Sequence, residues 1–338
     1  MYILGIESSC DETAAAVVTE NKEILSNVVY SQIQQHKPFG GVVPEIAARA
    51  HLEKIDVVVE KAIHDANIDI HDISAIASTC GPGLIGGVVV GATFGKALAM
   101  SLDIPFIAVN HIEAHALSAR LTDDLPFPYL LFLASGGHCQ ICIVRDVDDF
   151  EVIGRTIDDS IGESFDKVSK LLGYGYPGGA IIEKNAQLGN AEHFTLPRPL
   201  CAKGSLDFSF SGLKTAVLVA SQKCNTDQDK LDLCASFQSA VTDVVEYKIK
   251  HALKRCKDIN LSGVVMGGGV AANSSIRKRL ENLCQKYNTK FFAPPVKYCT
   301  DNGAMIAWLG VEKYQKKQFS DLGFKPTPRW ELGGKFQQ

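Results

Sequence analysis

Apolar and polar positions follow one another along this chain in an order that occurs twice. In the first half, three apolar runs separated by polar turns predict a strand meander. Longer segments with helical spacing and short apolar runs follow it, which predicts alternating helices and strands. The strands are expected at residues 2–7, 13–19, 23–31, 73–79 and 106–109, and the helices at 44–67, 84–102 and from 111 onward.

The second half begins the same order again near residue 128. Its meander is expected at residues 129–134, 139–144 and 150–156. Helices are expected at about 162–172, 178–189, 211–222, 229–257, 273–287 and 303–317, and further strands at 263–266 and 290–293. We therefore predict two similar α/β domains with a nucleotide cleft between them. The first comprises residues 1–127 with about 300–330, the second residues 128–299, and a proline-rich hinge lies near residues 125–128.

The segment His111-Ile112-Glu113-Ala114-His115 places two imidazoles four residues apart. On a helix they share one face, so they can bind one metal ion. Asp301, in the polar turn before the last predicted helix, could add a carboxylate. Two histidines and one carboxylate leave coordination positions open, as a catalytic metal requires. Two histidines at helical spacing are, however, more often ordinary surface or core residues.

Three turns have the composition of anion-binding loops. They are residues 8–13 (SSCDET), 135–138 (SGGH) and 267–273 (GGGVAAN). Backbone N–H groups and hydroxyls in such turns approach a ligand closely, because glycine adds no side chain. Two facing turns would clamp a phosphate, and the third, which runs from a strand into a helix, suits a nucleotide. Each turn alone is also compatible with a plain hairpin or helix cap.

Composition narrows the class of protein. Of 338 residues, 46% are apolar and 21% are charged, as in a soluble globular protein, and the net charge of -4 argues against binding nucleic acid or membranes by charge alone. Basic clusters at 248–257 and 277–279 are candidates for local contact with nucleic acid or are solvated helix faces.

The ten scattered cysteines indicate a reducing cytoplasm, and Cys139-x-x-Cys142 lies in a predicted strand, where the two thiols point to opposite faces. The weakly charged stretch from 81 to 102 contains Lys96 and is uncharged only from 81 to 95, which is too short to span a membrane, so it predicts a packed interior helix.

The duplicated architecture and its turns resemble the actin, sugar-kinase and Hsp70 (ASKHA) superfamily. Short motifs across nearly the whole chain further resemble the tRNA N6-adenosine threonylcarbamoyltransferase (TsaD) family, in its bacterial or organellar branch. They are ESSCDET (7–13), GGVVPE (40–45), CGPGL (80–84), HIEAH (111–115), LASGGH (133–138), GESFDKVSKLLG (162–173), YPGG (176–179), DFSFSGLKTA (207–216), GGGVAAN (267–273) and CTDNGAMIA (299–307).

The resemblance implies roles for particular residues. The metal ligands would be His111, His115 and Asp301, and the metal is expected to be iron, with zinc as the alternative. The bound substrate, threonylcarbamoyl-adenylate, would contact Leu133, Ala134, Ser135, Gly136, Gly137, Asp166, Gly179, Gly268, Gly269 and Asn273. Asp11 and Glu12 would face the reacting centre, and one of them is our candidate acceptor for the amine proton.

The resemblance also implies the reaction and its partners. The family moves a threonylcarbamoyl group from the adenylate to the N6 amine of the adenosine 3′ of the anticodon, in tRNAs that read codons beginning with A, and releases AMP. The implied partners are tRNA, a shorter metal-free paralogue of the same fold and a small P-loop ATPase, with no membrane.

Two other classes of enzyme have part of the same sequence pattern. A metal-dependent endopeptidase would use a His-x3-His pair, but its general base directly follows the first histidine in HExxH, whereas here Ile112 does and Glu113 lies elsewhere on the helix. An ATP-dependent small-molecule kinase of the same fold would use the clamp turns, but it has no need of a two-histidine metal site.

Overall fold

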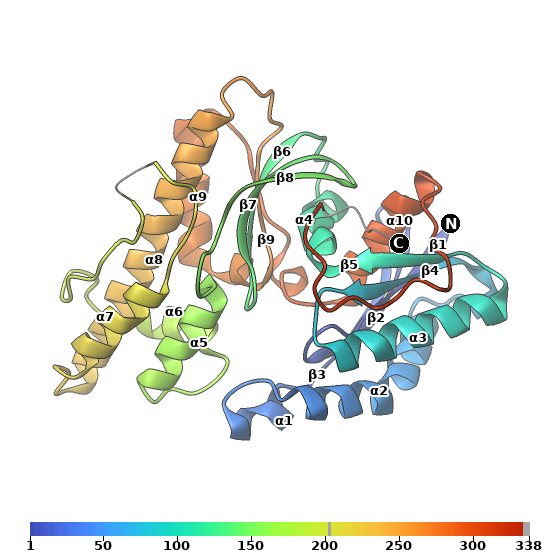
Figure 1. Cartoon of the computed structure of the whole chain (residues 1–338), viewed down its shortest axis with the longest axis horizontal. Coiled ribbons are helices and arrows are strands. Elements are labelled where there is room, and N and C mark those ends of the chain that lie inside the picture. Colours follow the sequence, from blue (N-terminus) through green and yellow to red (C-terminus); the bar gives the residue numbers. More distant parts are fainter. Residues whose placement is uncertain (202–203, 334–338) are drawn as a thin grey trace. The chain divides into compact units, whose positions relative to one another are not determined.

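The computed structural model describes residues 1–201 and 204–333, which form two compact units (Figure 1). The first unit comprises Met1–Asp124, Val147–Asp149 and the chain from Thr300 on. The second comprises Leu125–Asp146 and Phe150–Cys299. The domain boundaries given above and the nucleotide cleft stay predictions.

The first unit is built on a five-stranded mixed sheet with the strand order β3-β2-β1-β4-β5. Strands β1, β2 and β3 pair antiparallel as the predicted meander, and β4 and β5 extend the sheet in parallel. Its strands are β1 (Tyr2–Glu7), β2 (Glu12–Thr19), β3 (Ile24–Ser31), β4 (Ile73–Gly81) and β5 (Phe106–Asn110). Its helices are α1 (Ile33–His36), η1 (Lys37–Phe39), α2 (Pro44–Asp65), η2 (Ile70–Asp72), α3 (Ile85–Leu102), α4 (His111–Thr122) and α10 (Gly303–Gln315).

Helices cover both faces of this sheet, which explains why β1, β2 and β4 are almost continuously apolar. Helices α2 and α3 pack side by side against the sheet, and α10 packs against β1 and β2 and alongside α4. A Cβ atom on Gly5 would lie 2.3 Å from the backbone nitrogen of Ala307, so α10 approaches the sheet this closely only because residue 5 is glycine. The C-terminal helix thus brings Asp301, just ahead of it, to the start of α4.

The second unit repeats this topology, with the strand order β10-β9-β6-β7-β8. Strand β6 pairs antiparallel with β7 and parallel with β9, which pairs parallel with β10. The strands are β6 (Tyr129–Ala134), β7 (Cys139–Asp146), β8 (Asp149–Arg155), β9 (Val264–Gly267) and β10 (Phe291–Phe292). The helices are α5 (Ile161–Leu171), α6 (Gly178–Ala186), α7 (Ser211–Ser221), α8 (Asp227–Arg255), η3 (Gly269–Ala272), α9 (Ser274–Lys286) and η4 (Val296–Tyr298). The predicted duplication is confirmed.

A single cluster of buried side chains from the sheet and from α5 to α9 forms the core of the second unit. Cys139 belongs to this cluster and Cys142 does not, although both are buried, as expected for positions i and i+3 of one strand. The Cys-x-x-Cys segment is therefore part of a strand and not a metal site.

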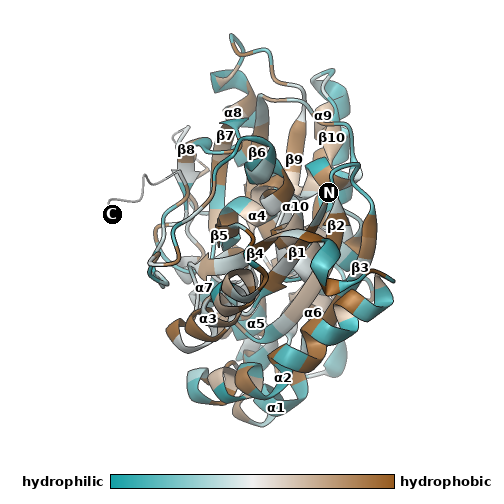
Figure 2. Cartoon of the chain, turned by 90° about the vertical axis from the view of Figure 1, so that its right-hand side faces the viewer, coloured by the Kyte–Doolittle hydropathy of each residue, from teal (hydrophilic) through white to brown (hydrophobic). Residues whose placement is uncertain are grey.

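Helix α3 is the one described helix that is long and apolar enough to span a membrane, by length and composition only. One face of it packs against β4, where a Cβ atom on Gly95 would lie 2.9 Å from Cβ of Ser78, as predicted for a core helix. Ile85 and Met100 remain exposed, and Figure 2 shows the helix as largely hydrophobic.

Candidate metal centre

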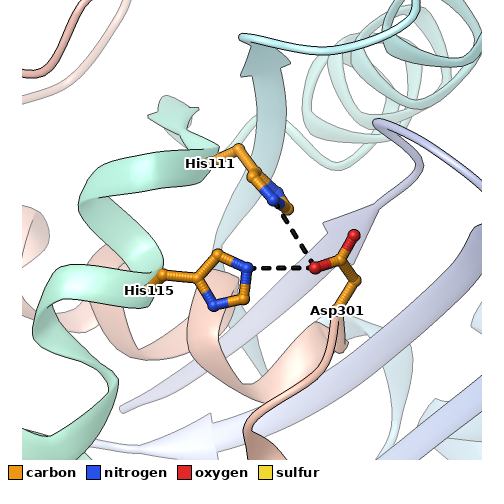
Figure 3. Close-up of side chains that lie close together, drawn as sticks. All are labelled: His111, His115 and Asp301. Carbon is orange, nitrogen blue, oxygen red and sulfur yellow. Dashed lines mark hydrogen bonds and ion pairs between the residues drawn. The ribbon is translucent and has the colours of Figure 1, made fainter. Parts of the chain in front are cut away.

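The two histidines of α4 and Asp301 converge in the first unit (Figure 3). The side chain of Asn110 caps α4 by accepting hydrogen bonds from the backbone N–H groups of Ile112 and Glu113, so His111 begins the helix. Asn302 caps α10 in the same way, which places Asp301 just before that helix. Two capped helix starts therefore present the three side chains to one point.

The separations between the side chains fit one divalent metal ion. Oδ1 of Asp301 lies 3.0 Å from Nε2 of His115 and 3.5 Å from Nε2 of His111. Adjacent ligands of one ion, at bond lengths of about 2.0–2.2 Å, lie roughly 3.0–3.5 Å apart. Two imidazole nitrogens and one carboxylate oxygen are also a donor set suited to iron or zinc. The residues present therefore fit a metal with open coordination positions.

Glu7, which the sequence analysis did not select, hydrogen-bonds to the His111 ring at Nδ1. Its carboxylate is fully buried, and its Oε2 lies 2.9 Å from Nδ1 of His111. Ser9 N–H and Thr79 Oγ1 also donate to this carboxylate. Because Nδ1 of His111 donates to Glu7, the lone pair of Nε2 is left for a metal ion. The available signal was a single acid at the end of an otherwise apolar strand, YILGIE.

The charges of Glu7 and His111 stabilise one another. Burial acts to raise the pKa of Glu7, but the charge and hydrogen bond of His111 outweigh it and leave this pKa below its ordinary value. Burial acts to lower the pKa of His111, but the charges of Glu7 and Asp301 outweigh it and raise this pKa to about 9. In the metal-free protein His111 is therefore protonated at neutral pH, and a metal ion competes with that proton.

The central acid of the HIEAH motif does not take part in this centre. Glu113 is buried, and its carboxylate lies 3.4 Å from Nζ of Lys313 on α10. Burial raises the pKa of Glu113. Arg120, about two turns further along α4, pairs with Glu312 in the same interface between α4 and α10. Glu113 therefore helps to hold α4 against α10, and it is not the general base that an endopeptidase needs.

The predicted catalytic turn lies near the same centre. Asp11 lies in the turn between β1 and β2, Glu12 begins β2, and Glu12 interacts electrostatically with Asp301. Burial, and then the charges of Asp301 and Asp11, raise the pKa of Glu12 well above its ordinary value. Burial also raises the pKa of the Cys10 thiol, with Asp11 and Asp301 adding to the effect. Cys10 therefore stays protonated and is no nucleophile.

In the second unit, the turn after β6 lies beside the glycine loop after β9. Gly268 has φ +83°, and a Cβ atom on it would lie 2.5 Å from the carbonyl oxygen of Ala134. Ser160 fixes the neighbouring turn by donating from Oγ to the carbonyl of Gly136, 2.6 Å away. Cβ atoms on Gly136 and Gly137 would meet nothing within 4 Å, so this turn has open space beside it. Leu133 and Ala134 thus lie against the glycine loop, and the turn that follows them has open space beside it.

The other predicted nucleotide contacts lie on helices that meet these loops. Helix α5 packs against α6 and η3. Asp166 of α5 accepts a hydrogen bond from the backbone N–H of Gly178 at 2.6 Å, which ties it to the start of α6, where Gly179 lies. Asn273 caps α9 and exchanges hydrogen bonds with Gln238. Gly269 begins η3 and has no atom within 4 Å of a Cβ position.

The basic clusters are only partly available for contact with nucleic acid. Lys248 is fully buried and donates to the carbonyls of Leu200 and Ser205. Arg279 pairs with Asp243 and Glu246. Lys248 therefore maintains the fold and is wrong as a candidate phosphate contact, whereas Arg279, which is partly exposed, stays a prediction. Lys250, Lys254, Arg255, Lys257 and Lys278 are exposed.

Comparison with known proteins connects this geometry to one family. The family model described as tRNA N6-adenosine threonylcarbamoyltransferase matches residues 23–308. Curated proteins of that name from Brucella canis and Brucella ovis are each 53% identical to this chain over 345 aligned residues. Each alignment covers 99% of this chain and 96% of the relative.

Solved structures of low sequence identity share the fold. HypF from T. kodakarensis aligns with a TM-score of 0.62 at 15% identity, over 93% of this chain and 48% of that one. Component A of the (R)-2-hydroxyglutaryl-CoA dehydratase of Acidaminococcus fermentans aligns with a TM-score of 0.52 at 16% identity, over 94% of this chain and 99% of that one. These alignments and the repeated sheet topology confirm the predicted ASKHA fold.

Proposed function

Because this chain belongs to the tRNA N6-adenosine threonylcarbamoyltransferase family, we propose that a metal ion held by His111, His115 and Asp301 serves its reaction. The chain is an enzyme that transfers a threonylcarbamoyl group to the N6 amine of an adenosine in tRNA. The observation that carries the proposal is the convergence of two imidazoles and one carboxylate, all within 4.8 Å of one another.

The chemistry explains why such a centre is needed. The exocyclic amine of adenosine is a poor nucleophile, because its lone pair is delocalised into the ring. The carbamoyl carbon of the donor, which we propose to be threonylcarbamoyl-adenylate, must therefore be strongly electrophilic. A bound metal ion with open positions supplies Lewis-acid polarisation of that carbonyl. The leaving group is then AMP, and the acceptor is the adenosine 3′ of the anticodon in tRNAs that read codons beginning with A.

The protein's own residues orient and hold this centre. Glu7 accepts a hydrogen bond from Nδ1–H of His111, which fixes the ring and its tautomer. The caps of α4 and α10 fix where these two helices begin, and so position His111, His115 and Asp301. Nothing in this arrangement requires movement of the backbone, so the ligands are preorganised.

Asp11 and Glu12 are the proposed acceptors of the proton that the amine loses when the new C–N bond forms. A base works best when its pKa lies near the working pH. The raised pKa of Glu12 supports it as a candidate.

In the second unit we propose that the nucleotide part of the donor contacts Leu133 to Gly137, Asp166 and Gly179, together with the glycine loop at Gly268, Gly269 and Asn273. The open space beside Gly136 and Gly137, and beside Gly179 and Gly269, supports close approach of a ligand to the backbone.

The metal and the partners are proposed on chemistry and resemblance. Two imidazoles and a carboxylate favour iron, with zinc as the alternative. A shorter paralogue and a small P-loop ATPase are proposed to act with the enzyme on tRNA. Apolar side chains exposed on α2 and α3 support a protein partner there: Leu52, Val57, Ile85, Val89 and Met100. The free thiols support a cytoplasmic location.

Metal analysis of the purified protein tests the metal proposal. We expect about one iron or zinc ion per chain by inductively coupled plasma mass spectrometry, and less than a tenth of this in His115→Ala. His64→Ala is the control, because the side chain of His64 is 86% exposed and lies in the last turn of α2, outside the metal centre. Equal metal content in His115→Ala and wild type would overturn the proposal.

A further inference from the structure

Buried polar side chains form a continuous series behind the turn that carries Asp11 and Glu12. They are Thr13, Gln32, His36 and His51, all fully buried in the first unit. The reaction described above assigns them no task. Burying polar groups costs free energy, and apolar side chains of similar volume often stabilise a core as well or better. Their hydrogen bonds therefore point to a role other than stability.

One end of the series fixes the proton of His51. Nε2 of His51 lies 3.1 Å from the carbonyl oxygen of Cys10, which can only accept a hydrogen bond. His51 therefore carries its proton on Nε2, and its Nδ1 accepts from Thr13 Oγ1 at 2.8 Å and from Gln32 Nε2 at 3.4 Å. Burial lowers the pKa of His51, which keeps the ring neutral.

The hydrogen bonds of His36, at the other end of the series, independently require the same donor-to-acceptor direction. The backbone N–H of Val43, which can only donate, lies 3.3 Å from Nδ1 of His36. His36 therefore donates from Nε2 to Oε1 of Gln32, 3.1 Å away. This leaves the amide nitrogen of Gln32 directed at His51, as the first end requires. All the hydrogen bonds thus run one way, from Val43 through His36, Gln32 and His51 to Cys10.

The series ends on the peptide groups around Asp11. His51 holds the carbonyl of Cys10, and the backbone N–H of Gln32 donates to the carbonyl of Asp11 at 2.9 Å. The peptide groups before and after Asp11 are therefore both fixed by members of the series. At the same edge of the ring, a Cβ atom on Gly87 would lie 2.9 Å from Cδ2 and 3.0 Å from Nε2 of His51, so α3 packs closely against the ring.

We propose that His51 is a positioning residue for the transfer reaction, because its Nε2–H holds the Cys10–Asp11 peptide group and so directs Asp11 and Glu12. Gln32 and His36 keep His51 in the tautomer that this requires. The proposal rests on the role proposed above for Asp11 and Glu12. A side chain displaced by about 1 Å can cost a reaction a hundredfold in rate, so the effect belongs in kcat and not in metal content.

Two substitutions separate the two ring nitrogens of His51. In His51→Gln the amide nitrogen replaces Nε2–H and keeps the bond to Cys10. In His51→Asn the amide oxygen replaces Nδ1, and the bond to Cys10 is lost. His64→Asn, at an exposed position of the same helix, is the control. Asp11→Asn and Glu12→Gln are measured beside them, with full-length protein, partner proteins, tRNA and threonylcarbamoyl-adenylate.

We expect kcat to fall at least tenfold in His51→Asn and less than threefold in His51→Gln, with KM for tRNA and metal content within twofold of wild type. Retention of kcat in His51→Asn while Asp11→Asn or Glu12→Gln loses it would overturn the positioning role alone. Retention of kcat in both acid variants would overturn the role of the turn and the positioning role together. Histidine-selective ¹⁵N NMR of the wild-type protein gives a test without mutation: a proton on Nδ1 of His51 would contradict the proposal.

Discussion

Replacing Glu7 with Gln is expected to weaken metal binding while leaving the fold intact. The substitution keeps the size of a fully buried side chain but removes its charge. Glu7 now accepts hydrogen bonds from His111, Ser9 and Thr79, so an amide nitrogen in place of one oxygen must face at least one of these donors. The hydrogen bond to His111 is charge-assisted, and its loss costs about 1.5–3 kcal/mol.

Above about pH 9, where His111 of the metal-free protein is neutral, this cost falls on the metal-binding form, because Glu7 holds the tautomer with a free Nε2. Since about 1.4 kcal/mol is tenfold in affinity, we expect metal affinity to fall roughly 10- to 100-fold. Competition with a chromophoric chelator measures it directly, at fixed pH. Glu60→Gln, on the exposed side of α2, is the control. Wild-type affinity in Glu7→Gln would show that Glu7 does not support the metal through His111.

Other predictions follow from the same geometry. Because the pKa of His111 is raised to about 9, a metal ion must displace its proton below that pH; metal affinity from chelator competition should therefore fall about tenfold for each unit that the pH drops below about 9, and a flat profile would contradict this. Glu113→Gln should keep kcat within threefold yet lower the free energy of unfolding in urea by about 1–3 kcal/mol, since it leaves Lys313 without its carboxylate. If Glu113 were instead the general base of an endopeptidase, Glu113→Gln would abolish activity. Asp166→Ala, which releases the first residue of α6, Gly178, should raise KM for the adenylate about tenfold with little change in kcat, as steady-state kinetics would reveal.

The sequence was sufficient for the parts of the fold that depend on local patterns. The two meanders, the long helices and the repeat follow from apolar periodicity and turn residues, and the observed sheets repeat one strand order. The four-residue helix α1 was not predicted, because so short a segment shows no periodicity. The expected helix from 178 to 189 ends at Ala186, within the usual uncertainty of helix ends.

The metal centre shows where sequence reasoning stops. Spacing identified His111 and His115 because one helix determines their separation, whereas Glu7 is brought to His111 only by the order of strands in the sheet. Lys248 looked like one member of an exposed basic run, yet it lies on the buried side of α8. The hydrogen bonds of His51 likewise depend on groups distant in sequence, namely the side chains of Thr13 and Gln32 and the backbone carbonyl of Cys10.

The most direct test of the metal-assisted transfer is nucleoside analysis by mass spectrometry after reaction in vitro. Unmodified tRNA is incubated with threonylcarbamoyl-adenylate, the partner proteins and one of three preparations: the native enzyme, the enzyme stripped of metal and then reloaded, or Asp301→Ala. We predict that N6-threonylcarbamoyladenosine forms with the first two and not with Asp301→Ala, whose metal content is also lost. Undiminished product from metal-free Asp301→Ala would contradict the account.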